Sequence, residues 1–217
     1  MLEILLISAG AVLETLFIMR SYKRRDASSV VLKTMASVVF VLLGLLELRR
    51  MGPSLYGWYV VAGLTLGMLG DLLLALRFLS EKLHRLFFAA GSVSFFLGHI
   101  VYILAILALC PAAWLYAIPI AVVALGAACF YAYAKEVRAG KITLLGVLYI
   151  GGVLFMTACA ATGAFIESNR ALFLFFVGDN MLVVLSFGKN DSPYRNAVLH
   201  VLYYMAQIFI ALTIKFV

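Results

Sequence analysis

Apolar residues occur along this chain in long runs that short polar joints separate. Crossing the hydrocarbon core of a bilayer as a helix takes about 20 apolar residues, and each run has roughly that length. The runs cover residues 2–19, 29–48, 55–76, 86–109, 112–134, 142–163, 170–187 and 196–216. None of them alternates apolar and polar residues as a barrel strand does. The pattern predicts an all-α polytopic membrane protein, a bundle of eight transmembrane helices forming a single domain over residues 1–217.

Composition supports this prediction. Hydrophobic residues make up 65% of the chain, charged residues 12%, and the mean hydropathy is +1.10, which leaves too little polar surface for a soluble domain. Glu3 stands where a signal peptide would carry a cationic segment, so the first run is expected to remain as a span. Cys110, Cys129 and Cys159 are odd in number and lie in or beside apolar runs, which favours packing over disulfides or metal binding.

The net charge of +7 follows the predicted membrane topology. Short cytoplasmic joints retain Lys and Arg, and most basic residues lie in the first, third, fifth and seventh joints. These residues are Arg20, Lys23, Arg24, Arg25, Arg77, Lys82, Arg85, Lys135, Arg138, Lys141, Lys189 and Arg195. Both termini are therefore predicted to be non-cytoplasmic, and no nucleic-acid partner is expected. The short joints favour a bacterial inner membrane over the endoplasmic reticulum.

Polar residues within spans are the first candidates for function, because burying them in lipid costs several kcal/mol unless they face protein or a wet cavity. The candidates are Lys33, Asp71, His99, Asp179 and Gln207. At about 1.5 Å per residue, Lys33 and Asp71 lie roughly 8 Å from the cytoplasmic helix ends, Asp179 and Gln207 roughly 13–17 Å, and His99 roughly 20 Å. All five could line one cavity that opens to the cytoplasm.

Helical spacing indicates which way Asp71 faces. Gly63, Gly67 and Gly70 place the acid on or beside a stripe of small residues, where another helix can approach closely. We therefore expect Asp71 to face protein. The simpler alternative is a structural acid that snorkels to the interface or pairs with Arg77.

Two further helix faces carry polar groups. His99 and Tyr102 share a face of the fourth run, and a face of the last run carries His200, Tyr203, Tyr204 and Gln207 at helical spacing. Hydrogen bonding between helices would be a sufficient role for these residues. Glu14 and Glu47 lie near Arg20 and Arg49, close to helix ends, and are expected to be interfacial partners of these arginines.

A faint internal repeat links the two halves. Gly70-Asp71 is followed by Leu74, and Gly178-Asp179 is followed by Leu182. The interval from Asp71 to His99 equals the interval from Asp179 to Gln207. This pattern permits a 4+4 parallel internal repeat with the two acids facing each other at the centre of the bundle.

The polar residues lie in segments that resemble a known family. The segments "GLTLGMLGDLLLAL", "FFAAGSVSFFLGHIVYILA", "LYIGGVLFMTACA", "ALFLFFVGDNMLVVLSF" and "LYYMAQIFIAL" are similar to the YhhN-like lysoplasmalogenases, small eight-span membrane proteins. The resemblance covers nearly the whole chain. Three positions depart from the family pattern: Thr34 replaces the Pro usual after the lysine, Gly178 the Ser usual before the acid, and Gly98 an Ala.

The resemblance implies an ether-bond hydrolase that cleaves the vinyl ether of lysoplasmalogens to a fatty aldehyde and glycerophosphoethanolamine or glycerophosphocholine. It implies acid-base catalysis by Asp71, Asp179 and His99, with Asp179 as general acid and the two acid roles interchangeable. The implied substrate-binding residues are Lys33, Tyr102, Tyr149, Asn180, Tyr203 and Gln207. Lys33 would hold the phosphate together with interfacial arginines. We expect no cofactor and no metal, and a lysophospholipid in the membrane as the partner.

Other classes of membrane protein use similar residues. Intramembrane aspartyl proteases also pair two acids, but here the first glycine of their GxGD motif is absent. Zinc hydrolases of the ceramidase type need several histidines at one site, whereas His84, His99 and His200 occupy different runs or depths. A proton-coupled lipid or small-molecule transporter would use the same buried acids as a relay and is the main alternative.

Overall fold

The computed structural model describes residues 1–134, 143–186 and 193–217. In this part of the chain the regular structure consists of eight α-helices and a final 3-10 turn. The helices are α1 (Leu2–Lys23), α2 (Ala27–Met51), α3 (Leu55–Leu76), α4 (His84–Leu109), α5 (Ala113–Ala134), α6 (Thr143–Phe165), α7 (Arg170–Ser186) and α8 (Pro193–Leu212), and the turn is η2 (Thr213–Phe216). The predicted all-α fold is thus confirmed.

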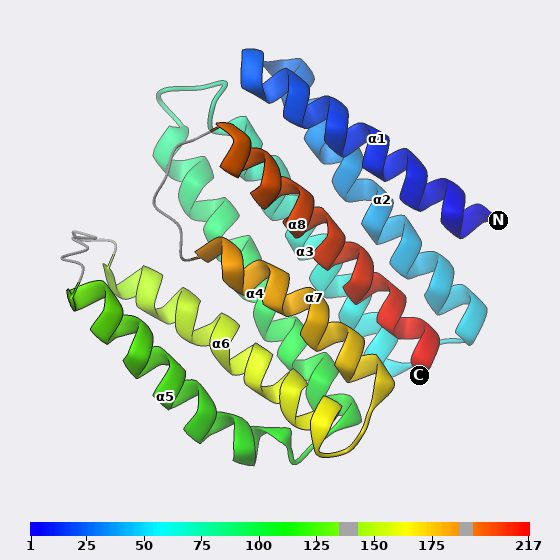
Figure 1. The fold of residues 1–217 in the computed structure, drawn as a ribbon. Coiled ribbons are helices and arrows are strands. Elements are labelled where there is room, and N and C mark those ends of the chain that lie inside the picture. The colour runs from blue at the N-terminus through cyan, green and yellow to red at the C-terminus, as the bar shows by residue number, and fades with distance from the viewer. Residues whose placement is uncertain (135–142, 187–192) are drawn as a thin grey trace.

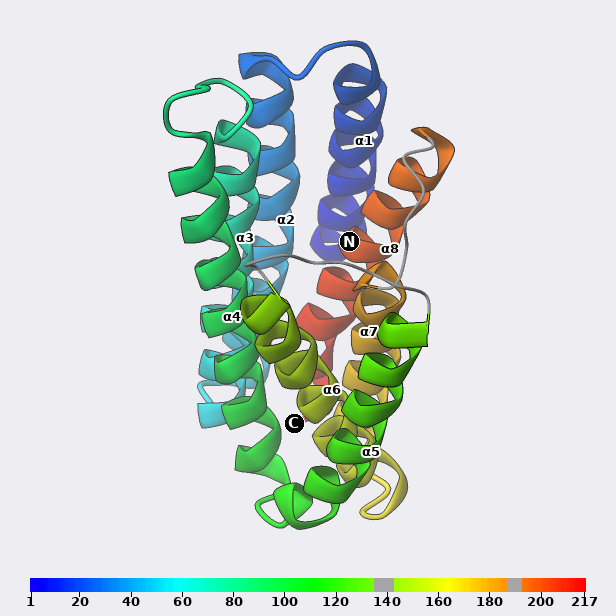
Figure 2. The same ribbon diagram turned by 90° about the vertical axis from the view of Figure 1, so that its left-hand side faces the viewer.

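Consecutive helices run up and down the bundle, so both termini lie at the same end (Figure 1). The α1–α2 and α3–α4 joints lie together at the opposite end (Figure 2). Helix α8 returns to pack against α1, α2 and α3, while α6 packs against both α4 and α5. Helices α1 and α5 therefore form the two flanks of the bundle, and α8 lies among the first three helices (Figure 1).

The outer surface of the bundle is apolar. Among the described residues, five helical segments are long and apolar enough to cross a bilayer, and two shorter apolar helices accompany them. Large apolar side chains face outward; Leu5 is 64% exposed and Val123 is 72% exposed. Such a surface is stable only in lipid. The chain is therefore a multi-pass membrane protein.

Polar residues and glycine define the helix ends. Asp26 caps α2 by accepting a hydrogen bond from the Ser29 amide at 3.1 Å, and Ser54 caps α3 through the Gly57 amide at 3.1 Å. Helix α2 stops at Gly52, whose φ of +92° strains any other residue. Helix α3 consequently has the predicted bounds, and the other helices differ from their predicted ranges by a few residues at one or both ends.

Gly63 and Gly70 of α3 lie against α4, and these two helices make the most extensive contact among the described residues. A Cβ at Gly91 would lie 3.2 Å from the Gly70 carbonyl oxygen, and one at Gly98 would lie 3.5 Å from the Gly63 carbonyl oxygen. The two backbones approach this closely because glycine leaves the space between them free. This packing turns Asp71 toward α2, where the acid is 7% exposed.

Candidate functional site

A buried ionic cluster joins the first three helices. Nζ of Lys33, on α2, lies 3.3 Å from Oε1 of Glu14 on α1 and 3.8 Å from Oδ1 of Asp71 on α3. The three side chains are between 4% and 8% exposed. A single cation thus lies between two carboxylates in the apolar part of the bundle.

Neighbouring groups hold this cluster in place. The Ser37 hydroxyl, one helical turn after Lys33, donates a hydrogen bond to Oδ2 of Asp71 at 2.6 Å. The rings of Tyr203 and Phe17 lie 4.6 Å and 5.3 Å from Nζ of Lys33, where cation–π attraction stabilises the ammonium group. The aromatic rings also exclude water from one side of the cluster. Lys33 is therefore fixed by contacts from α1, α3 and α8 together.

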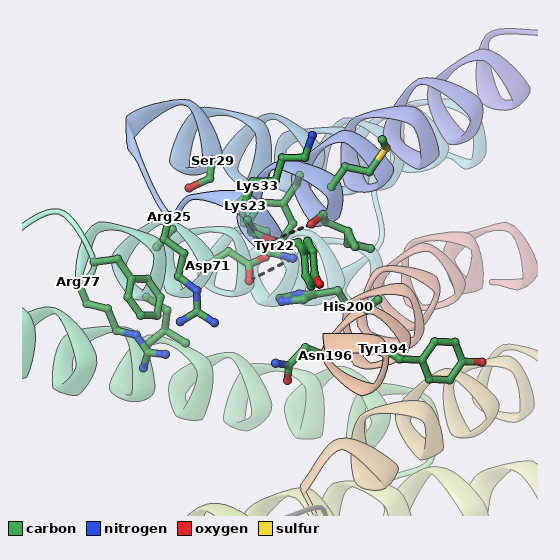
Figure 3. A pocket seen from close by; sticks show the side chains of 18 residues that line it. Tyr22, Lys23, Arg25, Ser29, Lys33, Asp71, Arg77, Tyr194, Asn196 and His200 are labelled. Atoms are coloured by element: carbon green, nitrogen blue, oxygen red, sulfur yellow. Dashed lines mark hydrogen bonds and ion pairs between the residues drawn. The ribbon is translucent and has the colours of Figure 1, made fainter. Parts of the chain in front are cut away.

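The cluster lies at the inner end of a cavity of about 840 Å³. The cavity lining includes Lys23, Arg25, Arg77 and Phe78, which lie at or beside the α1–α2 and α3–α4 joints, so the cavity reaches inward from that end of the bundle. Lys33 and Asp71 form its floor, and Arg25 and Arg77 lie at its mouth (Figure 3). His200 of α8 also lines the cavity, with Nδ1 3.8 Å from Oε1 of Glu14. The cavity thus combines a cationic mouth with a carboxyl group at its floor.

A second polar group lies deeper in the bundle. The Tyr102 hydroxyl donates a hydrogen bond to Oε1 of Gln207 at 3.0 Å and so connects α4 to α8. A Cβ at Gly67 would lie 3.6 Å from the Tyr203 hydroxyl and 3.9 Å from Oε1 of Gln207. These groups therefore adjoin one another at the small-residue stripe of α3.

The second intramembrane aspartate has a separate environment. Asp179 is fully buried on α7 and accepts a hydrogen bond from the Thr157 hydroxyl of α6 through Oδ2. Its Oδ1 has no hydrogen-bond partner among the described residues. His99 is 6% exposed, and its Nδ1 lies 2.6 Å from the Phe95 carbonyl oxygen of the preceding turn. Neither residue is part of the cavity lining.

The family model of the YhhN family matches residues 28–214, most of the chain and all of its helices from α2 to α8. The chain belongs to the YhhN family. The family resemblance that the sequence segments indicated is thereby confirmed. Neither a solved structure nor a protein of curated function matches the chain significantly.

The structure of this YhhN protein brings some of the predicted site residues together and leaves others apart. Lys33 and Asp71 meet at the cavity, and Tyr102 meets Gln207. No hydrogen bond or ion pair joins Asp71 to Asp179 in the described part of the chain. The side chains of Tyr149 and Asn180 lie outside the described residues.

Sequence reasoning missed Glu14, and the expected pairing of Glu14 with Arg20 is wrong. Arg20 pairs with Asp26 in the α1–α2 joint, and Glu14 is buried against Lys33. The available signal was helical spacing, because the residues of α1 buried in the YhhN bundle are Gly10, Glu14 and Phe17, one face of the helix. Glu47 does have an interfacial arginine partner, but it is Arg50, at 3.0 Å, and not Arg49.

The alternative of a structural pair between Asp71 and Arg77 is also wrong, because the contacts of Asp71 are with Lys33 and Ser37. Arg77 lies just after α3 and projects to the cavity mouth (Figure 3). Burial against apolar side chains, and then the nearby Arg25 cation, lowers the pKa of Arg77 below its ordinary value.

The described residues contain no group of three or more His, Cys, Asp or Glu side chains that could hold a metal ion.

Proposed function

We propose that this protein is a lysoplasmalogenase that hydrolyses the vinyl ether bond of lysoplasmalogens. Membership in the YhhN family supports a hydrolase of this type. The observation that carries the proposal is Asp71, a buried carboxyl group at the floor of a cavity whose mouth is cationic. A lysophospholipid has the complementary pattern, with a phosphate at one end of its glycerol and a vinyl ether near the other.

The reaction requires one well-placed proton donor. Protonation of the β-carbon of the vinyl ether forms a carbon–hydrogen bond and leaves an oxocarbenium ion at the carbon that carries oxygen. Water adds to this carbon and loses a proton, which gives a hemiacetal. Collapse of the hemiacetal breaks its bond to the glycerol oxygen and yields aldehyde and a glycerol hydroxyl. A single carboxyl group can donate the first proton, stabilise the cation as a carboxylate and accept the proton from water.

Charge balance favours one protonated acid in the cluster, which could serve as this donor. Two carboxylates around one ammonium carry an excess negative charge, which is costly in an apolar bundle. One additional proton on Glu14 or Asp71 neutralises the cluster and is available for transfer. Since Asp71 lines the cavity, we assign it the general-acid role. Lys33 and Glu14 would then set the charge of the cluster around it.

Asp179 and His99 remain proposed catalytic residues, although neither lines the cavity. Tyr102, which donates to Gln207, also packs edge-on against the Phe175 ring of α7, the helix that carries Asp179. Tyr203, whose ring lies 4.6 Å from Nζ of Lys33, and Gln207 would contact the substrate, and Tyr102 would orient Gln207. If Asp179 takes part in the chemistry, Asp179→Asn lowers kcat at unchanged substrate affinity and thermal stability. A change in thermal stability alone would assign it a packing role.

The two halves of the chain are proposed to form the 4+4 repeat, with all eight helices crossing the membrane. Two correspondences support this arrangement. The Ser37–Asp71 hydrogen bond between α2 and α3 is matched by the Thr157–Asp179 bond between α6 and α7. The packing of α2 on α8 is likewise matched by the packing of α6 on α4.

We further propose that the cavity opens to the cytoplasm and that both termini lie on the other side, in a bacterial inner membrane. Lys23, Arg25 and Arg77, which lie at the α1–α2 and α3–α4 joints, line the cavity, and cytoplasmic joints retain such residues. Reporter fusions active in only one compartment test this orientation. A C-terminal fusion that is active only in the cytoplasm would reverse it.

The test of function is a substrate panel given to the detergent-purified protein. The panel contains lysoplasmenylethanolamine, its saturated ether analogue and the corresponding acyl ester. Fatty aldehyde from the vinyl ether alone supports the proposal, and in D2O the aldehyde should carry one deuterium on the carbon next to the carbonyl. Fatty acid from the ester alone would indicate a lysolipid esterase. No product, together with gradient-driven lipid movement in vesicles, would indicate the transporter.

A further inference from the structure

Two arginines at the cavity mouth share one aromatic ring. The guanidinium carbon of Arg25 lies 4.3 Å from the centre of the Phe78 ring, and that of Arg77 lies 4.5 Å from the same centre. Arg77 also lies 5.3 Å from the ring of Phe88. Figure 3 shows both guanidinium groups on the same side of Asp71. Two like charges are thus held near each other at one place.

Neither arginine has an acidic partner in the described part of the chain. The acid of the adjoining joint, Asp26, pairs with Arg20. Nε of Arg77 is buried and has no hydrogen-bond partner among the described residues. A buried guanidinium donor without an acceptor is costly. This unsatisfied donor of Arg77, beside the exposed Arg25 cation, favours an anion that can accept hydrogen bonds from both arginines.

Lys33 does not suit this role, although the sequence suggested it. Its ammonium group already lies between Glu14 and Asp71, and one ionised acid of this pair is enough to balance its charge. The arginines at the mouth carry positive charge without this compensation. A negative ligand entering the cavity therefore meets Arg25 and Arg77 first and would stay with them.

The spacing along α3 also suits a lysophospholipid. Arg77 follows Asp71 by six positions, which corresponds to about 9 Å along a helix axis. In a lysoplasmalogen, the three glycerol carbons and their oxygens separate the phosphorus from the vinyl ether by a comparable extended length. A phosphate held at the mouth would thus place the vinyl ether beside Asp71.

We propose that Arg25 and Arg77, stacked on Phe78, form a binding site for a phosphate ester, which under the proposed function is the head-group phosphate of the lysolipid. The site confers preference for phosphate-bearing substrates, and it acts in binding and not in the proton transfer. An inorganic phosphate ion shares the chemistry that the two guanidinium groups recognise. The binding experiment below therefore includes both a lysolipid and inorganic phosphate.

The first arm measures turnover of two vinyl ethers, lysoplasmenylethanolamine and 1-O-alkenylglycerol, which lacks the phosphate. Arg25→Gln and Arg77→Gln should raise KM for the phosphate-bearing substrate by about 10- to 100-fold and leave alkenylglycerol turnover unchanged. Arg77→Lys should recover part of the loss, because it restores charge without the two-pronged geometry. Arg85→Gln is the matched control, since Arg85 is exposed at the start of α4 and outside the cavity lining. Equal loss on both substrates would overturn the proposal.

The second arm does not depend on catalysis, so it separates failure of this site from failure of the proposed function. It measures binding of the saturated ether lysophosphatidylethanolamine and of inorganic phosphate by thermal unfolding of the purified protein. Lipid stabilisation that is lost in Arg25→Gln and Arg77→Gln but kept in Arg85→Gln supports the head-group site. Stabilisation by inorganic phosphate alone, lost in the same variants, would keep the anion site and overturn its assignment to a lipid. Variants that bind both probes like Arg85→Gln would overturn the site itself.

Discussion

Nζ of Lys33 lies 3.3 Å from Oε1 of Glu14, so that a cation from α2 and an acid from α1 meet in the part of the bundle that apolar helices surround. Asp71 of α3 completes the cluster on the other side of the same ammonium group. The position of this cluster at the end of a cavity with a cationic mouth is the basis for the proposed chemistry.

Removing Lys33 should cost much more stability than removing one of its acids. Lys33→Met leaves two carboxyl groups buried without a counter-charge, and loss of one partner from a buried pair costs about 3–5 kcal/mol. Glu14→Gln leaves Lys33 with Asp71 and should be milder. In the double variant, Glu14→Gln should offset part of the Lys33→Met loss, with a coupling energy of about 1–3 kcal/mol. Equilibrium unfolding in mixed micelles measures all three variants, and a Lys33→Met protein as stable as the wild type contradicts the cluster.

Two glycines on the α3–α4 contact should respond differently to alanine. A Cβ at Gly63 would overlap the Tyr102 ring, so Gly63→Ala must displace that ring and weaken its bond to Gln207. The expected loss is about 1–3 kcal/mol. A Cβ at Gly98 meets its nearest neighbour at 3.5 Å, an ordinary contact, and alanine favours the helix. Melting temperatures should therefore fall for Gly63→Ala and stay level or rise for Gly98→Ala; the reverse order would contradict this packing.

Thr157 should matter through its hydroxyl group. Thr157→Val removes the donor to Asp179, whose Oδ1 already lacks a partner among the described residues. An unsatisfied buried carboxyl group costs about 1–3 kcal/mol, so the variant should unfold earlier. Thr157→Ser keeps the donor and serves as the control. Equal stability of the two variants would show that the Thr157 hydroxyl does not hold Asp179.

The α1–α2 joint should show a pH dependence in the acid range. The hydrogen bond from Arg20, followed by that from the Ser29 amide, lowers the pKa of Asp26 below its ordinary value of 3.8. A lowered folded-state pKa stabilises the folded protein above the unfolded-state pKa, and this stabilisation is lost as the pH falls through the folded-state value. Arg20→Gln should move the titration midpoint of Asp26 upward, which carboxyl NMR of the protein in micelles can follow. An unchanged midpoint would mean that the pair does not persist in solution.

Much of the fold could be predicted from the sequence, because long apolar runs and capping residues are local signals. Both ends of α3 were predicted correctly, since Ser54 caps its start and Arg77 follows its last apolar residue. Helix α1 continues to Lys23, beyond the predicted end of its span, because a helix can extend into the polar interface where hydropathy no longer marks it. A change from apolar to polar residues therefore does not mark where such a helix ends.

The site was predictable only in part. Lys33 and Asp71 stood out because each is an ionisable residue in an apolar run. Glu14 was assigned to the wrong partner, since sequence distance to Arg20 says nothing about which helix face meets α2. Asp71 and Asp179 lie in separate environments because of the way α4, α6 and α8 pack at the centre of the helix bundle. Long-range packing of this kind has no local signal in the sequence.

The most direct test of the central claim is the rate of fatty aldehyde release from lysoplasmenylethanolamine by three proteins: wild type, Asp71→Asn and Asp26→Asn. Asparagine nearly matches aspartate in size but cannot donate a carboxyl proton. It also caps a helix well, so Asp26→Asn controls for the substitution itself. We predict wild-type release for Asp26→Asn and a loss of about 100-fold or more for Asp71→Asn, measured at a temperature at which both variants remain folded. Aldehyde release by Asp71→Asn at the wild-type rate, or none by the wild type, would contradict the assignment of this cavity as the site of vinyl ether hydrolysis.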